Sequence, residues 1–78
     1  MDNWKIELVP NPSTGSFQIN CGFATFDVVV TDITGKVLYT QNDQHVENMI
    51  STQPWAPATY FVTVRYNGLS KVERLQVR

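Results

Sequence analysis

The fold of this chain is decided by one stretch, Thr59-Tyr60-Phe61-Val62-Thr63-Val64-Arg65-Tyr66, and by the Asn67-Gly68 pair that follows it. In this stretch Tyr60, Val62, Val64 and Tyr66 occupy alternate positions, which is the period of a β-strand with one buried face. Asn-Gly is the strongest short signal for a β-hairpin. We therefore expect the chain to turn back here into one more strand.

The returning strand should run from Ser70 to Val77. Leu75 and Val77 share a face in such a strand and should point inward. Val72 is out of phase with them, which predicts a β-bulge near Glu73. This final strand is our candidate for the edge of a sheet, and an exposed edge favours weak self-association at high concentration.

The same alternation recurs upstream in shorter segments. Apolar residues favour strands at Trp4, Ile6 and Leu8, at Phe17 and Ile19, in the β-branched run 26–33, at 37–40 and, more weakly, at 46–52. Turn signals separate them: Pro10-Asn11-Pro12-Ser13-Thr14-Gly15 cannot lie inside a sheet, and Gly35 supplies the positive φ of a hairpin loop over 32–36. Residues 41–44 are polar and are predicted as loop.

About seven short strands with no helical periodicity predict an all-β fold, an immunoglobulin-like Greek-key sandwich. The 78 residues allow one domain, residues 1–78, with a modest core. No leader is visible, since Met1-Asp2-Asn3 has neither a basic start nor an apolar core. We expect the chain to be the C-terminal domain of a larger secreted protein that carries its leader elsewhere.

Composition argues against several functions. The net charge of −1 gives no basic field to gather phosphates, so nucleic-acid binding has little electrostatic support. One cysteine, Cys21, and one histidine, His45, cannot form a Cys/His metal site, and the carboxylates are dispersed. We predict that the domain is not an enzyme and needs no metal or cofactor. Cys21 is expected as a packing residue and His45 as a solvated loop residue.

Aromatic residues leave a binding role open. Trp4, Tyr39, Trp55, Tyr60 and Tyr66 could form a platform for sugars, as in carbohydrate-binding sandwiches. We favour core packing for Tyr60 and corner packing for Trp55, and expect Trp4 and Tyr66 to be the more exposed. A carbohydrate-binding or adhesive module of a secreted hydrolase is therefore the alternative function.

Four segments in order resemble one known family. Pro10-Asn11-Pro12-Ser13-Thr14-Gly15-Ser16-Phe17-Gln18-Ile19 is similar to the opening motif P-N-P-x-x-G-x-F-x-I of the type IX secretion system C-terminal sorting domain, type A. The segments 28–38, 58–64 and 71–78 resemble its D-x-x-G-K hairpin, its G-x-Y strand and its basic and apolar ending. Ala58 stands where the family usually has glycine, and Glu73 where it often has a basic residue.

The resemblance implies that the domain is a recognition signal for protein export. Such a domain ends a larger secreted cargo protein, passes through the periplasm and is recognised by the outer-membrane translocon. A sortase-like cysteine peptidase then removes it as the cargo is attached to the cell surface. Carried onto this sequence, the recognition residues would be Pro10, Asn11, Pro12, Gly15, Gly35, Lys71, Arg74, Val77 and Arg78. The Pro-Asn-Pro turn could equally be structural, with the Asn11 side chain bonded to nearby backbone.

Overall fold

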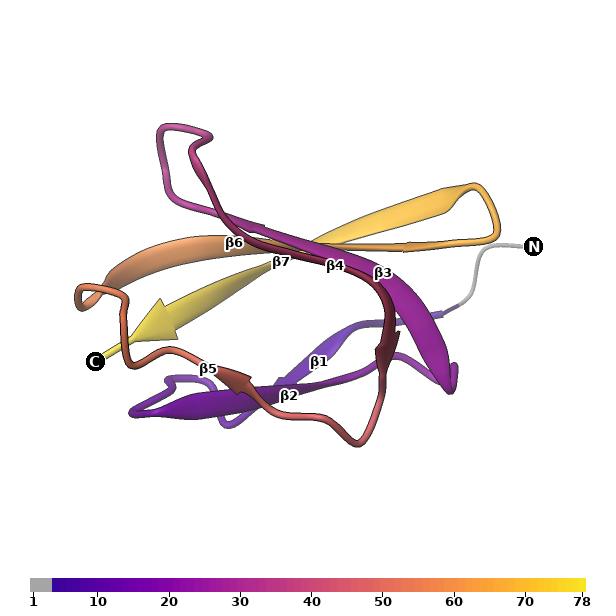
Figure 1. The fold of residues 1–78 in the computed structure, drawn as a ribbon, viewed down its shortest axis with the longest axis horizontal. Helices are drawn as coiled ribbons and strands as arrows, with labels where there is room; N and C mark the ends of the chain where they lie inside the picture. The colour runs from indigo at the N-terminus through magenta and orange to yellow at the C-terminus, as the bar shows by residue number, and fades with distance from the viewer. Residues whose placement is uncertain (1–3) are drawn as a thin grey trace.

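The computed structural model describes residues 4–78 and is an all-β sandwich. Its strands are β1 (Glu7–Val9), β2 (Ser16–Asn20), β3 (Thr25–Thr31), β4 (Val37–His45), β5 (Ile50–Ser51), β6 (Ala58–Tyr66) and β7 (Leu69–Val77). One layer has the order β1-β2-β5 and the other β4-β3-β6-β7, and every neighbouring pair is antiparallel. Figure 1 shows the two layers facing each other. The predicted immunoglobulin-like sandwich is confirmed.

Alternation along the strands builds the core. On β3 and β6 every second residue is buried, and the buried set includes Val28, Val30, Val62 and Val64. Phe17 and Ile19 of β2 meet them from the opposite layer. No described residue belongs to a helix long and apolar enough to cross a membrane.

The β6–β7 hairpin forms as its sequence predicts. Asn67 and Gly68 both have positive φ, at 53° and 81°, which a type I′ turn requires. Leu75 and Val77 are buried, as expected. The β-bulge near Glu73 is wrong, because β7 pairs with β6 in unbroken register from Leu69 to Val77. Val72 simply lies on the outer face of the sheet and is 59% exposed.

Three other boundaries differ from the sequence prediction. Residues 41–44, expected as loop, continue β4 to His45, because an exposed edge strand needs no apolar alternation. The weak strand over 46–52 shrinks to Ile50–Ser51, and the first strand begins at Glu7 instead of Trp4. The register shifts lie between β3 and β4, at Phe26/Val28 and Val30/Thr31.

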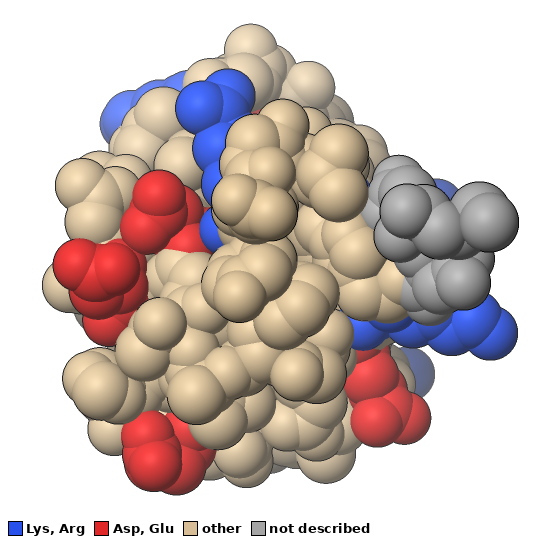
Figure 2. All heavy atoms as spheres, turned by 90° about the vertical axis from the view of Figure 1, so that its right-hand side faces the viewer, with Lys and Arg blue, Asp and Glu red and all other residues tan. Residues whose placement is uncertain are grey.

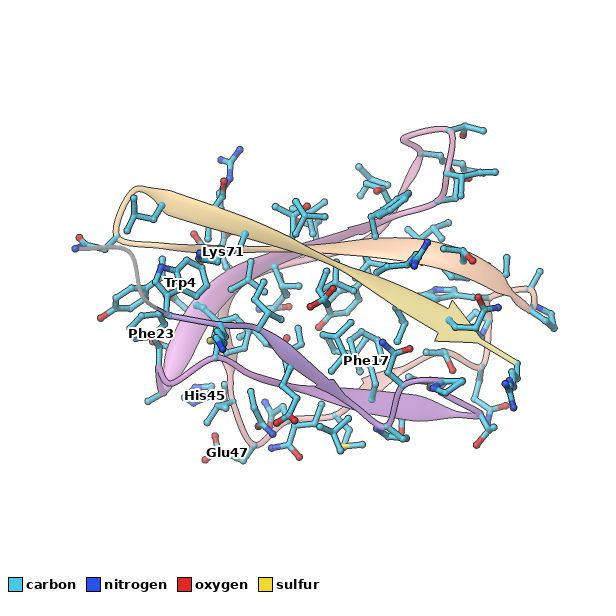
Figure 3. The ribbon with its side chains drawn as sticks, turned by 180° about the vertical axis from the view of Figure 1, so that it is seen from behind. Trp4, Phe17, Phe23, His45, Glu47 and Lys71 are labelled. Carbon is cyan, nitrogen blue, oxygen red and sulfur yellow. The ribbon has the colours of Figure 1, made fainter. Side chains whose placement is uncertain are left out.

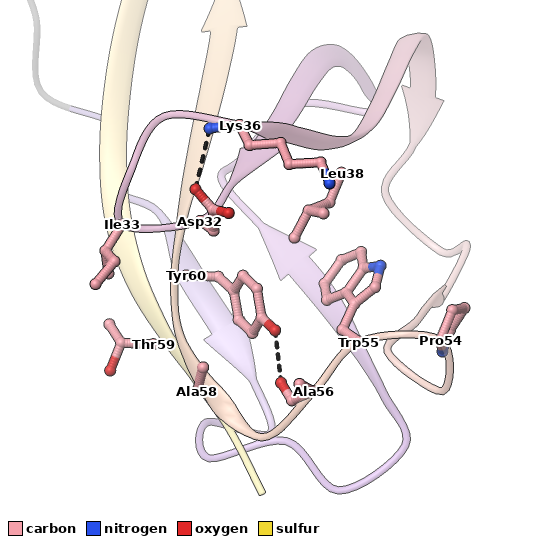
Figure 4. A pocket seen from close by; sticks show the side chains of 10 residues that line it. All are labelled: Asp32, Ile33, Lys36, Leu38, Pro54, Trp55, Ala56, Ala58, Thr59 and Tyr60. Carbon is pink, nitrogen blue, oxygen red and sulfur yellow. Dashed lines mark hydrogen bonds between the residues drawn. The ribbon is translucent and has the colours of Figure 1, made fainter.

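A tyrosine corner marks the start of β6. Tyr60 is buried, and its hydroxyl donates a hydrogen bond to the carbonyl of Ala56, four residues earlier (Figure 4). This contact is a hallmark of Greek-key sandwiches at the same position. Trp55 packs against Tyr60 with 5.4 Å between ring centroids, so both aromatic residues have the packing roles predicted for them.

Candidate functional site: a clasp on the last strand

The Pro-Asn-Pro turn crosses from the β1-β2-β5 layer to β7. Pro10 and Pro12 have no N–H to offer a sheet, and the peptide bonds before both are cis. Both prolines and Asn11 are exposed, whereas Ser13 is completely buried. We call Asn11 and Ser13, with the bonds they make to β7, the clasp.

Asn11 binds β7 as a peptide group of a neighbouring strand would. Its Nδ2 donates to the carbonyl of Arg74 at 2.9 Å, and its Oδ1 accepts from the amide of Gln76 at 3.0 Å. One side-chain amide thus satisfies a carbonyl and an N–H two residues apart on the strand edge. These partners lie 63 and 65 residues further along the chain, so the predicted bond to nearby backbone is wrong.

Ser13 completes the clasp through its backbone. Its N–H donates to the carbonyl of Gln76 at 2.8 Å, and its carbonyl accepts from the N–H of Arg78 at 2.9 Å. The two bonds form an isolated parallel bridge to Val77. The Ser13 hydroxyl donates to the carbonyl of Ser16 and lies 3.5 Å from the hydroxyl of Thr52, so the buried side chain keeps polar partners.

The structure brings most of the predicted recognition residues together here. Arg74 and Val77 lie on the strand that Asn11 and Ser13 bind, and Arg78 follows it directly. Pro10 and Pro12 flank Asn11. Gly15 follows directly, and its carbonyl accepts from Thr52 at 2.9 Å.

Gly35 and Lys71 lie elsewhere. Gly35 has a φ of 92° in the exposed β3–β4 hairpin, where its N–H donates to the carbonyl of Asp32 at 3.0 Å. The Asp32 carboxylate accepts bonds from the Thr34 hydroxyl and from the backbone of Thr34 and Lys36, and these bonds lower its pKa. The Gly35 position therefore belongs to a well-bonded turn, separate from the clasp.

Lys71 belongs to an aromatic cluster at the hairpin end of β7. Its Nζ lies 5.6 Å from the ring centroid of Trp4, a cation–π distance, and Figure 3 shows the two side chains together. Trp4 meets Phe23 edge-on at 5.4 Å, and Phe23 stacks on Tyr66 at 3.7 Å. Tyr66 is 38% exposed, as predicted, but Trp4 is only partly exposed because it packs in this cluster.

A mostly apolar hollow of about 510 Å³ lies between the β3–β4 hairpin and the corner before β6 (Figure 4). Trp55 and Tyr60 form part of its wall, with Leu38 beside them and Asp32 and Lys36 near its rim. Trp55 also leans on Phe17 in the core, with 6.4 Å between ring centroids. The five aromatic residues considered for sugar binding are thus divided between this corner, the cluster around Trp4, and Tyr39 on β4.

The titratable residues singled out from the sequence have packing or surface positions in the described chain. Within residues 4–78 no three His, Cys, Asp or Glu side chains gather as metal ligands. Cys21 is buried, and that burial raises the pKa of its thiol, as suits a packing residue. His45 is exposed at the end of β4 with its Nδ1 3.5 Å from a Glu47 carboxylate oxygen. On the face in Figure 2, acidic and basic side chains are scattered over a largely uncharged surface and in places lie side by side.

Sequence reasoning missed Ser13 and Gln76 as parts of the site. Ser13 carries the bridge to Val77, and Gln76 is bonded through both its N–H and its carbonyl. The available signal was the unusual position of a small polar residue directly after a Pro-Asn-Pro turn. Its burial depends on β7, which the sequence places more than 60 residues away.

Comparison with known proteins agrees with these motifs. A family profile described as the secretion system C-terminal sorting domain matches residues 7–78, which include the clasp and all of β7. No curated protein matches the chain. Because the match covers nearly the whole chain, the protein belongs to the family of type IX secretion system C-terminal sorting domains.

Proposed function

We propose that the folded domain is the address that the outer-membrane type IX translocon reads on a larger secreted protein. The cargo precedes it in the chain and passes with it through the periplasm. A sortase-like cysteine peptidase then removes the domain as the cargo is attached at the cell surface. The domain itself performs no chemistry and holds no cofactor or metal.

The clasp is the observation that supports this proposal most directly. The opening motif and the closing segment of the family lie at opposite ends of the sequence, and here they form one bonded surface. Arg74 and Arg78 expose their side chains there, while their backbone groups are held by Asn11 and Ser13. A partner that binds this surface would contact the opening motif and the closing segment together.

A reporter fusion tests the proposal. The domain is fused behind a secretory leader and a reporter, in a bacterium with a type IX system, and the reporter is quantified in the periplasm and at the surface. The intact fusion should reach the surface without the domain, and deleting the sortase-like peptidase should leave the fusion uncut. Changing the exposed Arg74 and Arg78 to Ala should leave the reporter in the periplasm, because the translocon would lose these side chains. The fold should survive, since the backbone bonds of both residues to the clasp are kept.

The matched control is Arg65→Ala, which removes an exposed arginine of β6 outside the clasp and should be exported normally. Export of the Arg74→Ala/Arg78→Ala fusion at the intact level would show that these side chains are not read. If the intact fusion itself stays in the periplasm, the sorting assignment fails. Binding of sugars by the corner around Trp55 would then become the leading hypothesis.

Self-association through β7 is a secondary proposal. The clasp covers only the C-terminal part of this edge, so the remaining part is open to a second copy. We expect association to be weak and visible by light scattering at millimolar concentration, and strictly monomeric behaviour there would contradict it.

A further inference from the structure

The outer edge of β7 has two halves with different backbone bonding. Gln76 directs both its N–H and its carbonyl away from β6, into the clasp. In an antiparallel pair this direction repeats at every second residue, so Arg74, Val72 and Ser70 also direct their backbone groups outward. The clasp satisfies the carbonyl of Arg74 and both groups of Gln76, whereas the described residues provide no backbone partner for Ser70 and Val72 on that side.

We propose that the outward backbone groups of Ser70 and Val72, on this half of the β7 edge, receive an extended strand of a partner protein. The inference rests on the proposed function and names how the secretion machinery contacts the domain. The incoming chain would use its own N–H and carbonyl groups to pair with Ser70 and Val72, as in other cases of β-strand addition. The Asn11 amide ends the pairing, because it already occupies the next groups along the edge.

The surroundings of Val72 provide room for such a strand. Val72 is 59% exposed, and a hollow of about 230 Å³ separates residues 71–73 from residues 4–6. Trp4 and Ile6 line this hollow on one side and Val72 on the other, while Lys5, Lys71 and Glu73 bring charges to it. A side chain of the incoming strand that points toward the other layer can enter this hollow, between Ile6 and the segment 71–73.

The opposite edge of the same sheet is less suited to strand addition. β4 departs from regular register with β3 at two places, and Asp43 near its end has a φ of 57°. Irregularities of this kind twist an edge away from a flat partner. β7 keeps nine consecutive residues in register with β6 and presents a regular edge.

Proline substitution tests the edge, because proline lacks the N–H that the partner strand would bind. The variant is Val72→Pro, since the Val72 N–H points away from β6 and its loss spares the β6–β7 bonds. In the fusion assay we expect Val72→Pro to lower surface reporter by up to about tenfold, the effect of losing one net hydrogen bond. Val72→Thr keeps the N–H and should be exported normally.

Thr40→Pro is the matched control on the other edge. Backbone groups alternate in direction along each strand, and the pairing registers carry this alternation from β7 through β6 and β3 to β4. The Thr40 N–H then points away from β3, so proline at this position keeps the β3–β4 hydrogen bonds. Thr40→Pro should be exported like the intact domain. Each purified variant must melt within a few degrees of the intact domain, and Ser70→Pro replaces Val72→Pro if the latter does not fold.

The outcomes are distinct. Normal export of Val72→Pro while the intact fusion is exported overturns strand addition and leaves the sorting function standing. Loss of export by Val72→Thr as well would show that the side chain, and not the edge, is read. Failure of the intact fusion refutes the proposed function and this inference with it. If neither proline variant folds, a photo-crosslinking residue at position 72 must label a translocon protein more strongly than one at position 40, or the proposal is wrong.

Discussion

The two ends of β7 are both held against the N-terminal part of the chain, but by different forces. At the hairpin end, Phe23 stacks on Tyr66 and meets Trp4 edge-on, and Lys71 lies over the Trp4 ring. At the C-terminal end, Asn11 and Ser13 bind β7 through directional hydrogen bonds. Aromatic packing tolerates small displacements, whereas paired hydrogen bonds fix the register of a strand.

The difference bears on which residues each end of β7 can accept. A stack of rings can be rebuilt from other aromatic residues, so its sequence can vary without loss of packing. The clasp needs a side-chain amide at position 11, followed by a small residue that can be buried at position 13. Directional bonding therefore accounts for the asparagine between the two prolines and for the serine that follows them.

Removing Val77 and Arg78 should destabilise the domain more than any change at the hairpin end of β7. The deletion removes a side chain that is 3% exposed and the bond from Arg78 N–H to Ser13. Loss of the buried valine side chain and of this hydrogen bond should together lower the free energy of unfolding by about 3 kcal/mol. Urea denaturation measures this free energy. Deletion of Arg78 alone keeps the valine and should lower the free energy of unfolding by only about 1 kcal/mol. Equal costs for the two deletions would mean that Val77 adds nothing to the core.

The expected instability of the Val77-Arg78 deletion affects how recognition of these last residues can be tested. From the sequence, losing Val77 and Arg78 should only fray an end if the domain is a generic sandwich. The burial of Val77 argues against that expectation, because the deletion also removes a core side chain. Loss of export by this deletion would therefore mix unfolding with lost recognition, which is why the export test uses exposed arginines.

Asn11→Ala should give the next largest effect. It removes two bonds to the β7 backbone and leaves the core intact, so we expect a loss of about 1.5 kcal/mol. Amide exchange at Gln76 should accelerate, whereas exchange at Tyr66 near the hairpin should be unchanged. Asn11→Asp keeps an acceptor for Gln76 but offers no donor to Arg74, and it should not restore stability. A full rescue by Asp would contradict the two-bond description.

Phe23→Leu should have the smallest effect. Leucine keeps most of the apolar contact but loses the ring geometry with Trp4 and Tyr66, which is worth about 1 kcal/mol. Thermal denaturation can measure the change, with export expected to remain normal because the clasp is intact. A Phe23→Leu domain that melts normally but is no longer exported would place recognition at the aromatic end.

Local patterns were sufficient for much of the fold. The alternation in β6 and the Asn67-Gly68 turn are determined by neighbouring residues, so they could be predicted. The polar part of β4 was missed because an edge strand takes its structure from β3, and the bulge at Glu73 was wrong because Val72 faces solvent. Of the clasp, Asn11 was predicted as a recognition residue but Ser13 and the bonds to β7 were not, since nothing local to Asn11 indicates a partner on β7.

The long sequence separation inside the clasp has a consequence for the order of events during synthesis. Asn11 and Ser13 are made early, whereas the backbone groups that they bind belong to the last residues of the chain. A nascent chain, or one cut short before β7, cannot form these bonds, and pairings between such distant residues form late in folding. A receptor that requires the closed clasp would therefore reject interrupted chains and select molecules whose translation has reached the end of this domain.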